Sequence, residues 1–142
     1  INGNERIIDF GCGSGILAIA ALKLGAACAL GVDNDPQAVV ASRDNAQRND
    51  IDADDFPVVL PDDGVIAQWD DSADLMVANI LAGTLVELAD QLISLTAPGG
   101  TILLTGVLEA QAPELIECYR NVNLEVNQQR DEWVLLVGKK AS

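Results

Sequence analysis

The sequence predicts one α/β domain over residues 1–142, with a mostly parallel seven-stranded sheet, helices on both faces and a C-terminal antiparallel hairpin. Short runs of β-branched residues alternate with longer helical patterns, as in chains that join parallel strands by helices. A glycine-rich segment follows the first of these runs. In Rossmann-like sheets such a segment marks the end of the sheet where ligands bind.

The first half of the chain contains three strand patterns and two helix patterns. The strand patterns occupy residues 6–10, 27–32 and 56–60. A helix rich in Ala and Leu is expected at 16–24, where Gly25 ends it. Asp35 and Pro36 open a second helix that runs to about Asn49, because aspartate is a favoured N-cap and proline suits the first helical turn.

The second half begins with an acidic segment, residues 61–72, which we predict to be a loop. Strand patterns follow at residues 75–79, 101–105, 124–128 and 133–138, and helix patterns at 84–95 and 110–121. A Pro-Gly-Gly turn at 98–100 is expected to precede the fifth strand. The last two strands are expected to form the hairpin.

The charge balance is strongly acidic, with 22 acidic and 8 basic residues and a formal net charge of −14. Such a surface repels phosphate backbones and attracts basic partners, so direct nucleic-acid binding is not expected. Solubility or adaptation to salt explains the same charge equally well. Because no run reaches the ~18 apolar residues of a membrane span and no signal peptide is evident, we expect a cytoplasmic protein with no membrane contact.

Histidine and cysteine usage limits the possible chemistry. The chain has no histidine, and its cysteines are scattered without CxxC spacing, at Cys12, Cys28 and Cys118. A zinc site and a Ser-His or Cys-His catalytic pair are therefore not expected within these residues. We predict no metal and a reducing environment.

Gly11, Gly13 and Gly15 lie between the first strand pattern and the following helix. Glycine permits positive φ and lets a ligand approach the main chain, and the helix N-terminus adds free N–H donors. A tight turn without a ligand explains the same glycines. Asp33 favours binding, because it lies 22 residues beyond Gly11 (33 − 11), near the offset of about 20 expected of a ribose-binding carboxylate. Helix capping is its alternative role, for which Asp35 is better placed.

Glycine spacing and charge distinguish S-adenosyl-L-methionine from a dinucleotide. The loop reads GxGxG, so its third glycine comes one residue early for the usual approach of a pyrophosphate. Asp9 precedes the loop, and its carboxylate would repel a pyrophosphate but attract an ammonium and a sulfonium. The residues predicted to bind S-adenosyl-L-methionine are Asp9, Gly11, Cys12 (through its backbone N–H), Gly13, Asp33 and Asn79.

Asn79 ends the fourth strand pattern and is the predicted catalytic residue. Its amide oxygen and the backbone carbonyl of Ile80 are expected to accept hydrogen bonds from a substrate amine and to aim the nitrogen lone pair at the methyl carbon. Methyl transfer needs an uncharged amine in line with the S–CH₃ bond at roughly 3 Å. A turn residue at a strand end is the alternative role for Asn79. Weaker candidates are residues 60–61 beside an adenine and residues 106–111 at the substrate mouth.

Three segments, DFGCGSGILAIAA at 9–21, GVDNDPQA at 31–38 and ANILAG at 78–83, resemble the bacterial ribosomal protein L11 methyltransferase (PrmA) family. The resemblance implies a class I methyltransferase fold and methylation of lysine ε-amines and the N-terminal α-amine of a basic large-subunit ribosomal protein. It implies that Gly11 and Asp33 bind the cofactor and that Asn79 lies between cofactor and substrate. On this resemblance, residues 1–142 are not expected to include the family's N-terminal substrate-recognition domain.

Three other functions remain open on the sequence. A class I methyltransferase for RNA or a small molecule would carry the same first two motifs. An NAD-dependent oxidoreductase is disfavoured by the GxGxG spacing, by Asp9 and by the lack of histidine. A non-catalytic cofactor-binding module is the third alternative.

Overall fold

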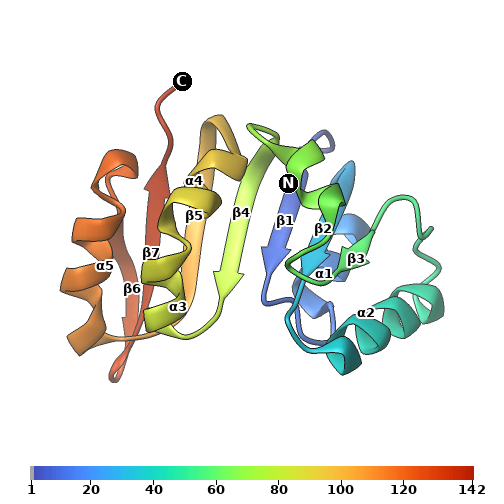
Figure 1. The fold of residues 1–142 in the computed structure, drawn as a ribbon, viewed down its shortest axis with the longest axis horizontal. Coiled ribbons are helices and arrows are strands. Elements are labelled where there is room, and N and C mark those ends of the chain that lie inside the picture. The colour runs from blue at the N-terminus through green and yellow to red at the C-terminus, as the bar shows by residue number, and fades with distance from the viewer. Residues whose placement is uncertain (1) are drawn as a thin grey trace. The chain divides into compact units, whose positions relative to one another are not determined.

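The computed structural model describes residues 2–142, and the chain forms two compact units that meet between Trp69 and Asp70 in the sequence. The first unit contains β1 (Arg6–Phe10), α1 (Ile16–Lys23), β2 (Cys28–Val32), α2 (Pro36–Arg48), β3 (Val58–Val59) and the 3-10 helix η1 (Gly64–Trp69) (Figure 1).

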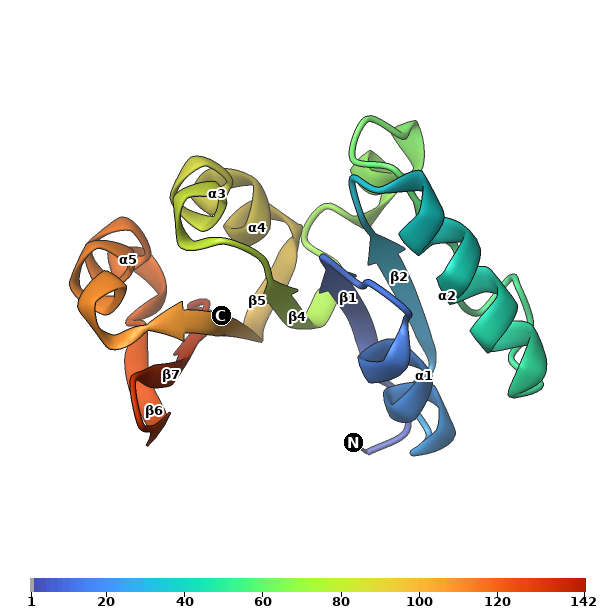
Figure 2. The ribbon, with the colours of Figure 1, turned by 90° about the horizontal axis from the view of Figure 1, so that it is seen from below.

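In the first unit, three parallel strands lie in the order β3-β2-β1. Four of the five residues in both β1 and β2 are buried, as expected of central strands of a parallel sheet. Phe10 pairs with Val32, so the segments after β1 and β2 leave the strands side by side. Helix α1 packs on β1 and β2, α2 packs on β2 and β3, and the two helices touch (Figure 2).

The start of α2 follows the prediction. The side chain of Asp35 accepts a hydrogen bond from the N–H of Gln37 at 2.9 Å, and Pro36 occupies the first turn. The carboxylate therefore satisfies one of the donors that every helix leaves free at its N-terminus. Because Asp35 caps the helix, Asp33 is not needed for that role.

The second unit contains β4 (Ala73–Asn79), α3 (Ala82–Glu87), α4 (Ala89–Leu95), β5 (Thr96–Leu108), η2 (Glu109–Gln111), α5 (Ala112–Cys118), η3 (Arg120–Val122), β6 (Glu125–Arg130) and β7 (Trp133–Lys139). Its strands lie in the order β4-β5-β7-β6, with β4 and β5 parallel and the last two pairs antiparallel. Figure 2 shows α3, α4 and α5 on the same side of these strands. The seven predicted strands and the C-terminal hairpin are confirmed.

Two predictions in the first unit need correction. The third strand is two residues long, Val58–Val59, instead of 56–60. Pro57 accepts the N–H of Gly31 but has no N–H to donate to β2, so the regular strand begins after it. The segment 61–72 is not entirely a loop, because η1 buries Ile66 and Trp69 and gives this acidic stretch its own apolar anchors.

The second unit also differs from its predicted elements. The helix expected at 84–95 is two helices, α3 and α4, which meet at Leu88. Strand β5 begins at Thr96 instead of 101, because the Pro-Gly-Gly segment bends within the strand at Gly99 (φ 79°) and the register shifts there. The helix expected at 110–121 is shortened to α5, with a 3-10 turn on each side.

Candidate functional site

The glycine loop between β1 and α1 is fastened to the end of β2. Gly11, Gly13 and Gly15 have φ of 82°, 57° and 84°, a region that side-chain-bearing residues rarely adopt. The N–H groups of Gly11 and Cys12 both donate to the carbonyl oxygen of Val32, at 2.6 and 3.1 Å. A Cβ added to Gly13 would meet no atom within 4 Å, so this point of the loop faces open space. A ligand can therefore approach the main chain at Gly13.

Asp33 follows β2 and holds the same loop. Its Oδ2 accepts a hydrogen bond from the N–H of Gly13 at 2.9 Å, and its Oδ1 accepts one from the N–H of Asp35 at 3.0 Å. Each carboxylate oxygen has a second lone pair, so acceptor capacity remains for the hydroxyls of a ribose. The structure thus brings Asp33 and the glycine loop together, as the sequence predicted.

Asp9 carries a buried carboxyl group whose oxygens accept no hydrogen bond within the described residues. Its side chain is 1% exposed, and neither carboxylate oxygen has a hydrogen-bond partner among residues 2–142. Burial raises the pKa of Asp9 from 3.8 to about 6. The nearby backbone N–H of Ala18 in α1 lowers this pKa, although it does not meet the geometry of a hydrogen bond, and the charge of Asp33 raises it. An unpartnered carboxylate is costly inside a protein, and a cationic ligand group would relieve the cost.

The backbone N–H of Cys12, predicted to meet the cofactor, is occupied by Val32 in this conformation. Its buried Sγ lies 3.5 Å from Oγ of Ser42. Ser42 donates its only hydroxyl proton to the carbonyl oxygen of Gly13, at 2.8 Å, so Cys12 must be the donor in the contact with Ser42. Burial raises the pKa of the Cys12 thiol to about 11. The thiol therefore stays protonated and serves as a packing and donor group, not as a nucleophile.

Asn79 ends β4 in the second unit, where it pairs with Thr105 of β5. The residue is exposed, and its side-chain amide makes no hydrogen bond within the described part of the chain. Gly106 leaves room for this amide, because a Cβ there would lie 2.7 Å from Asn79 Oδ1. Ile80 follows the strand in a bend and is half-buried. The strand end thus presents an exposed side-chain amide that is free to bind a ligand.

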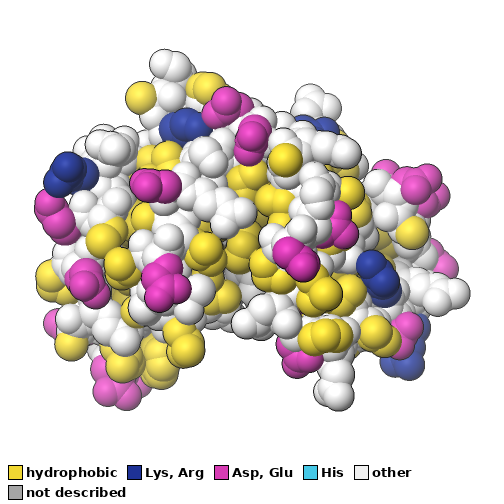
Figure 3. Space-filling model, in the orientation of Figure 1, with side chains coloured by type: hydrophobic (Ala, Val, Ile, Leu, Met, Phe, Trp, Pro, Cys, Tyr) yellow, Lys and Arg dark blue, Asp and Glu magenta, His cyan; other side chains and the backbone are white. Residues whose placement is uncertain are grey.

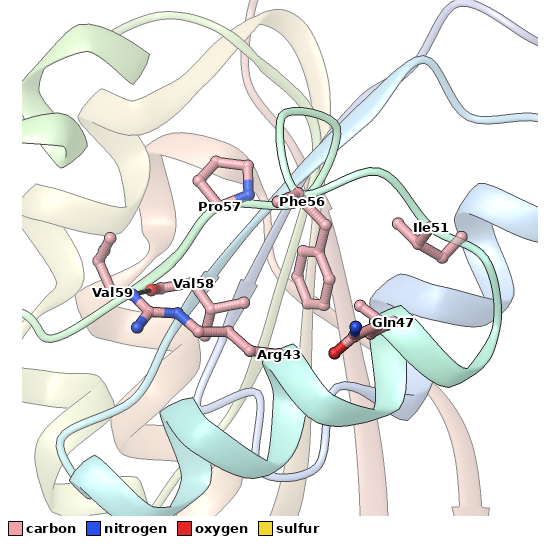
Figure 4. A pocket seen from close by; sticks show the side chains of 9 residues that line it. Arg43, Gln47, Ile51, Phe56, Pro57, Val58 and Val59 are labelled. Carbon is pink, nitrogen blue, oxygen red and sulfur yellow. Dashed lines mark hydrogen bonds between the residues drawn. The ribbon is translucent and has the colours of Figure 1, made fainter.

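A pocket of about 500 Å³ lies between α2 and the segment that leads into β3 (Figure 4). Phe56 is turned toward α2, and Nη2 of Arg43 donates to the carbonyl oxygen of Val58 at 2.7 Å. None of the predicted cofactor or substrate residues lines this pocket. Ligands of parallel α/β sheets bind beyond the carboxyl ends of the strands, so we do not assign the cofactor to it.

Comparison with known proteins decides the family. A family model described as "Ribosomal protein L11 methyltransferase (PrmA)" matches residues 1–141. The chain belongs to the PrmA family. It is 52% identical over 137 residues to the ribosomal protein L11 methyltransferase of Chromohalobacter salexigens, covering 95% of this chain and 44% of that protein. The corresponding protein of Pseudomonas paraeruginosa is also 52% identical, with 96% and 45% covered. The chain thus spans less than half the length of these PrmA relatives.

Solved structures confirm the class I methyltransferase fold of this PrmA-family chain. A ribosomal protein L11 methylase from Lactobacillus delbrueckii subsp. bulgaricus matches with a TM-score of 0.82 at 31% identity, over 99% of this chain and 72% of that one. A methyltransferase from Pyrococcus furiosus matches with a TM-score of 0.81 at 17% identity, over 99% and 77%, which supports the fold alone.

No described helix has the length and apolar character needed to cross a membrane. Among residues 2–142, no group of three or more His, Cys, Asp or Glu side chains could hold a metal ion. Sequence reasoning missed Ser42 and Asn45 of α2, which bind the glycine loop. Their spacing of three places them on one helix face, but the sequence does not say what that face contacts.

Proposed function

We propose that this chain is the cofactor-binding and methyl-transferring part of an enzyme that methylates amino groups of ribosomal protein L11. The names of the PrmA relatives supply the protein substrate. Lysine ε-amines and the N-terminal α-amine are the proposed acceptors. The buried carboxylate of Asp9, which accepts no hydrogen bond among residues 2–142, carries the proposal, because it calls for a cationic ligand group beside the glycine loop.

S-adenosyl-L-methionine fits the charges of the first unit and would supply a methyl group on a sulfonium. Asp9 would accept the cofactor's ammonium, because a cation next to a buried carboxylate stabilises its charged form. Asp33 would accept the ribose hydroxyls with the lone pairs left after its bonds to Gly13 and Asp35. Gly11 and Gly13 would let the cofactor approach the main chain without a side chain in the way. Cys12 is part of the same loop, and its backbone N–H is bound to Val32.

Asn79 and Ile80 are the proposed substrate-binding residues, and Asn79 is the proposed catalytic one. The Asn79 Oδ1 and the Ile80 carbonyl oxygen would accept the N–H groups of a neutral amine, which leaves the nitrogen lone pair free to form the N–CH₃ bond. The sulfonium is already a good leaving group, so positioning carries most of the rate enhancement. The proton of the methylated amine passes to solvent.

The surface charge supports a basic protein substrate over RNA. Figure 3 shows acidic side chains spread over the face in view, with few basic side chains between them. The formal net charge of −14 would steer a basic protein toward this chain and repel a phosphate backbone. An RNA or small-molecule methyltransferase is the alternative, and the substrate assay below separates the two.

Calorimetry with S-adenosylhomocysteine, which retains the ribose and the ammonium, tests the cofactor site. We expect binding to the wild type and none to NAD at the same concentration. Asp33→Ala should weaken binding by about 1–3 kcal/mol, the usual cost of removing a charged hydrogen-bonding partner. Asp35→Ala is the matched control, because it removes the same charge and a helix cap but no proposed cofactor contact. Equal affinity of the two variants, or tighter binding of NAD, would refute the assignment.

A second assay tests the substrate. Methyl-labelled S-adenosyl-L-methionine is incubated with a protein of the full length of the PrmA relatives that contains this chain, and with ribosomal protein L11, ribosomal RNA or free amino acids. We expect label on the ribosomal protein, on lysine and the N-terminal residue. Label on RNA alone would show that RNA is the substrate in place of the ribosomal protein. The assignment of the cofactor site would be unaffected by that result.

A further inference from the structure

Two side chains of α2 bind the carbonyl groups of the glycine loop. Ser42 Oγ donates to the carbonyl oxygen of Gly13 at 2.8 Å, and Asn45 Nδ2 donates to that of Ser14 at 2.9 Å. Ser42 is fully buried, and Asn45 is half-buried. The two residues lie three apart on α2 and so share one face of the helix. These contacts belong to neither the predicted cofactor set nor the pocket beside α2.

The loop is also in close steric contact with these elements. A Cβ at Gly15 would lie 3.2 Å from both Cβ and Oγ of Ser42 and from Cε2 of Phe56. Phe56, whose ring is turned toward α2 in Figure 4, therefore packs against the last glycine of the loop. The side of the loop at Gly15 is filled by the protein, while the side at Gly13 is open.

Both the backbone N–H groups and the backbone carbonyl groups of the glycine loop are hydrogen-bonded. The N–H groups of Gly11, Cys12 and Gly13 are bound to the end of β2, by Val32 and Asp33. The carbonyl groups of Gly13 and Ser14 are bound by side chains of α2. A glycine-rich segment loses much conformational entropy when it is ordered. Contacts that order it before the ligand arrives remove this cost from binding.

We infer that Ser42 and Asn45 are positioning residues that hold the glycine loop in its cofactor-binding conformation. They would touch no cofactor atom and would act through the carbonyls of Gly13 and Ser14. The inference rests on the proposed function, because it assigns the loop to S-adenosyl-L-methionine. It extends that function to a helix face whose only role in the fold would otherwise be packing.

Asn45→Ala and Asn49→Ala form a matched pair for the test. Both asparagines lie at the end of or just after α2, and both donate Nδ2 to a backbone carbonyl, at 2.9 and 2.8 Å. Asn45 binds the loop, whereas Asn49 binds the carbonyl of Asn45 in its own helix. We expect Asn45→Ala to weaken S-adenosylhomocysteine binding roughly three- to tenfold, the range for one lost hydrogen bond, and Asn49→Ala to bind as the wild type does.

Amide hydrogen exchange gives a reading that does not need a ligand. In Asn45→Ala the amides of Gly11 and Gly13 should exchange faster than in the wild type, while those of β2 keep their rates. Asn49→Ala should leave the loop amides unchanged. Urea unfolding of both variants checks that the fold is retained. If Asn45 has a purely structural role, Asn45→Ala and Asn49→Ala should show similar shifts in urea midpoint and similar losses of affinity.

Asn45→Asp separates hydrogen bonding from packing, because it keeps the shape of the side chain but replaces the donor with an acceptor that faces the Ser14 carbonyl. We expect a loss of affinity at least equal to that of Asn45→Ala. Wild-type affinity and exchange in Asn45→Asp, or equal behaviour of the Asn45 and Asn49 variants, would overturn the inference. Failure of the wild type to bind the ligand would instead refute the proposed function, and loop exchange would still decide the role of Asn45.

Discussion

Replacing Asp9 with asparagine is expected to stabilise the ligand-free protein at neutral pH and to weaken cofactor binding. The folded protein buries this carboxyl group with no hydrogen-bond partner among residues 2–142, and its pKa rises from 3.8 to about 6. At about 1.4 kcal/mol for each pKa unit, holding the charged form at pH 7 costs about 3 kcal/mol of folding free energy. Asparagine has a similar shape and carries no charge, so it avoids most of this cost.

The pH dependence gives the sign of the effect. Because the folded state binds the Asp9 proton more tightly than the unfolded state, this group makes the free energy of unfolding fall as the pH rises from about 4 to about 6. Asp9→Asn does not titrate there. The difference in unfolding free energy between the variant and the wild type should therefore grow from near zero at about pH 4 to about 3 kcal/mol at pH 7.

Urea unfolding at several pH values measures this difference, with the fluorescence of the buried Trp69 as the signal. The difference in unfolding free energy between the variant and the wild type cancels the repulsion among the other acidic residues, because both proteins share it. Asp54→Asn, an exposed position, is the control for net charge. A variant no more stable than the wild type at pH 7 would refute the buried-charge reasoning.

Calorimetry on the same Asp9 variant tests the function of the carboxylate. If Asp9 attracts the ammonium of the cofactor, Asp9→Asn should bind S-adenosylhomocysteine more weakly while folding more stably. Functional sites often carry such a cost in stability. Wild-type affinity together with higher stability would leave Asp9 as a structural defect and remove it from the proposed cofactor site.

Two further predictions concern Gly106 and the thiols. Gly106→Ala should lower methyl-transfer turnover far more than Gly99→Ala. Both glycines have positive φ, 72° and 79°, so the backbone strain is similar. Of the two, only a Cβ at Gly106 would lie 2.7 Å from Asn79 Oδ1 and displace that amide. Equal turnover of the two variants would contradict the role of Asn79. In thiol labelling, the exposed Cys118 should react in the folded protein and the buried, protonated Cys12 only in urea. Rapid labelling of native Cys12 would be inconsistent with the burial of its thiol.

Several parts of the candidate site were predictable from the sequence because they depend on near neighbours. Glycines at Gly11, Gly13 and Gly15 permit positive φ, and all three have it. Aspartate before proline predicted the cap of α2, and Asp35 provides it. Asp33 was predicted to belong to the site of the loop from its offset of 22 residues beyond Gly11, and it accepts the N–H of Gly13. In each case a short pattern and one rule of chain geometry were sufficient.

Local patterns failed where a contact with another element changed the outcome. Residues 61–72 read as a polar loop, yet η1 buries Ile66 and Trp69. The Pro-Gly-Gly segment read as a turn before the fifth strand, yet its bend lies within β5. Composition describes the average environment of a segment and does not show which of its few apolar side chains will find a core.

The sequence by itself determined the family of folds and the position of the glycine loop, and it predicted a positive charge on the ligand of that loop. Only the tertiary structure decided that the Asp9 carboxylate has no hydrogen-bond partner in the described part of the chain, that Ser42 and Asn45 hold the loop, and that Gly106 makes room for Asn79. The physical reason is separation along the chain. Ser42 and the Gly13 carbonyl that it binds are 29 residues apart, and only the packing of α2 against the loop brings them within hydrogen-bond distance.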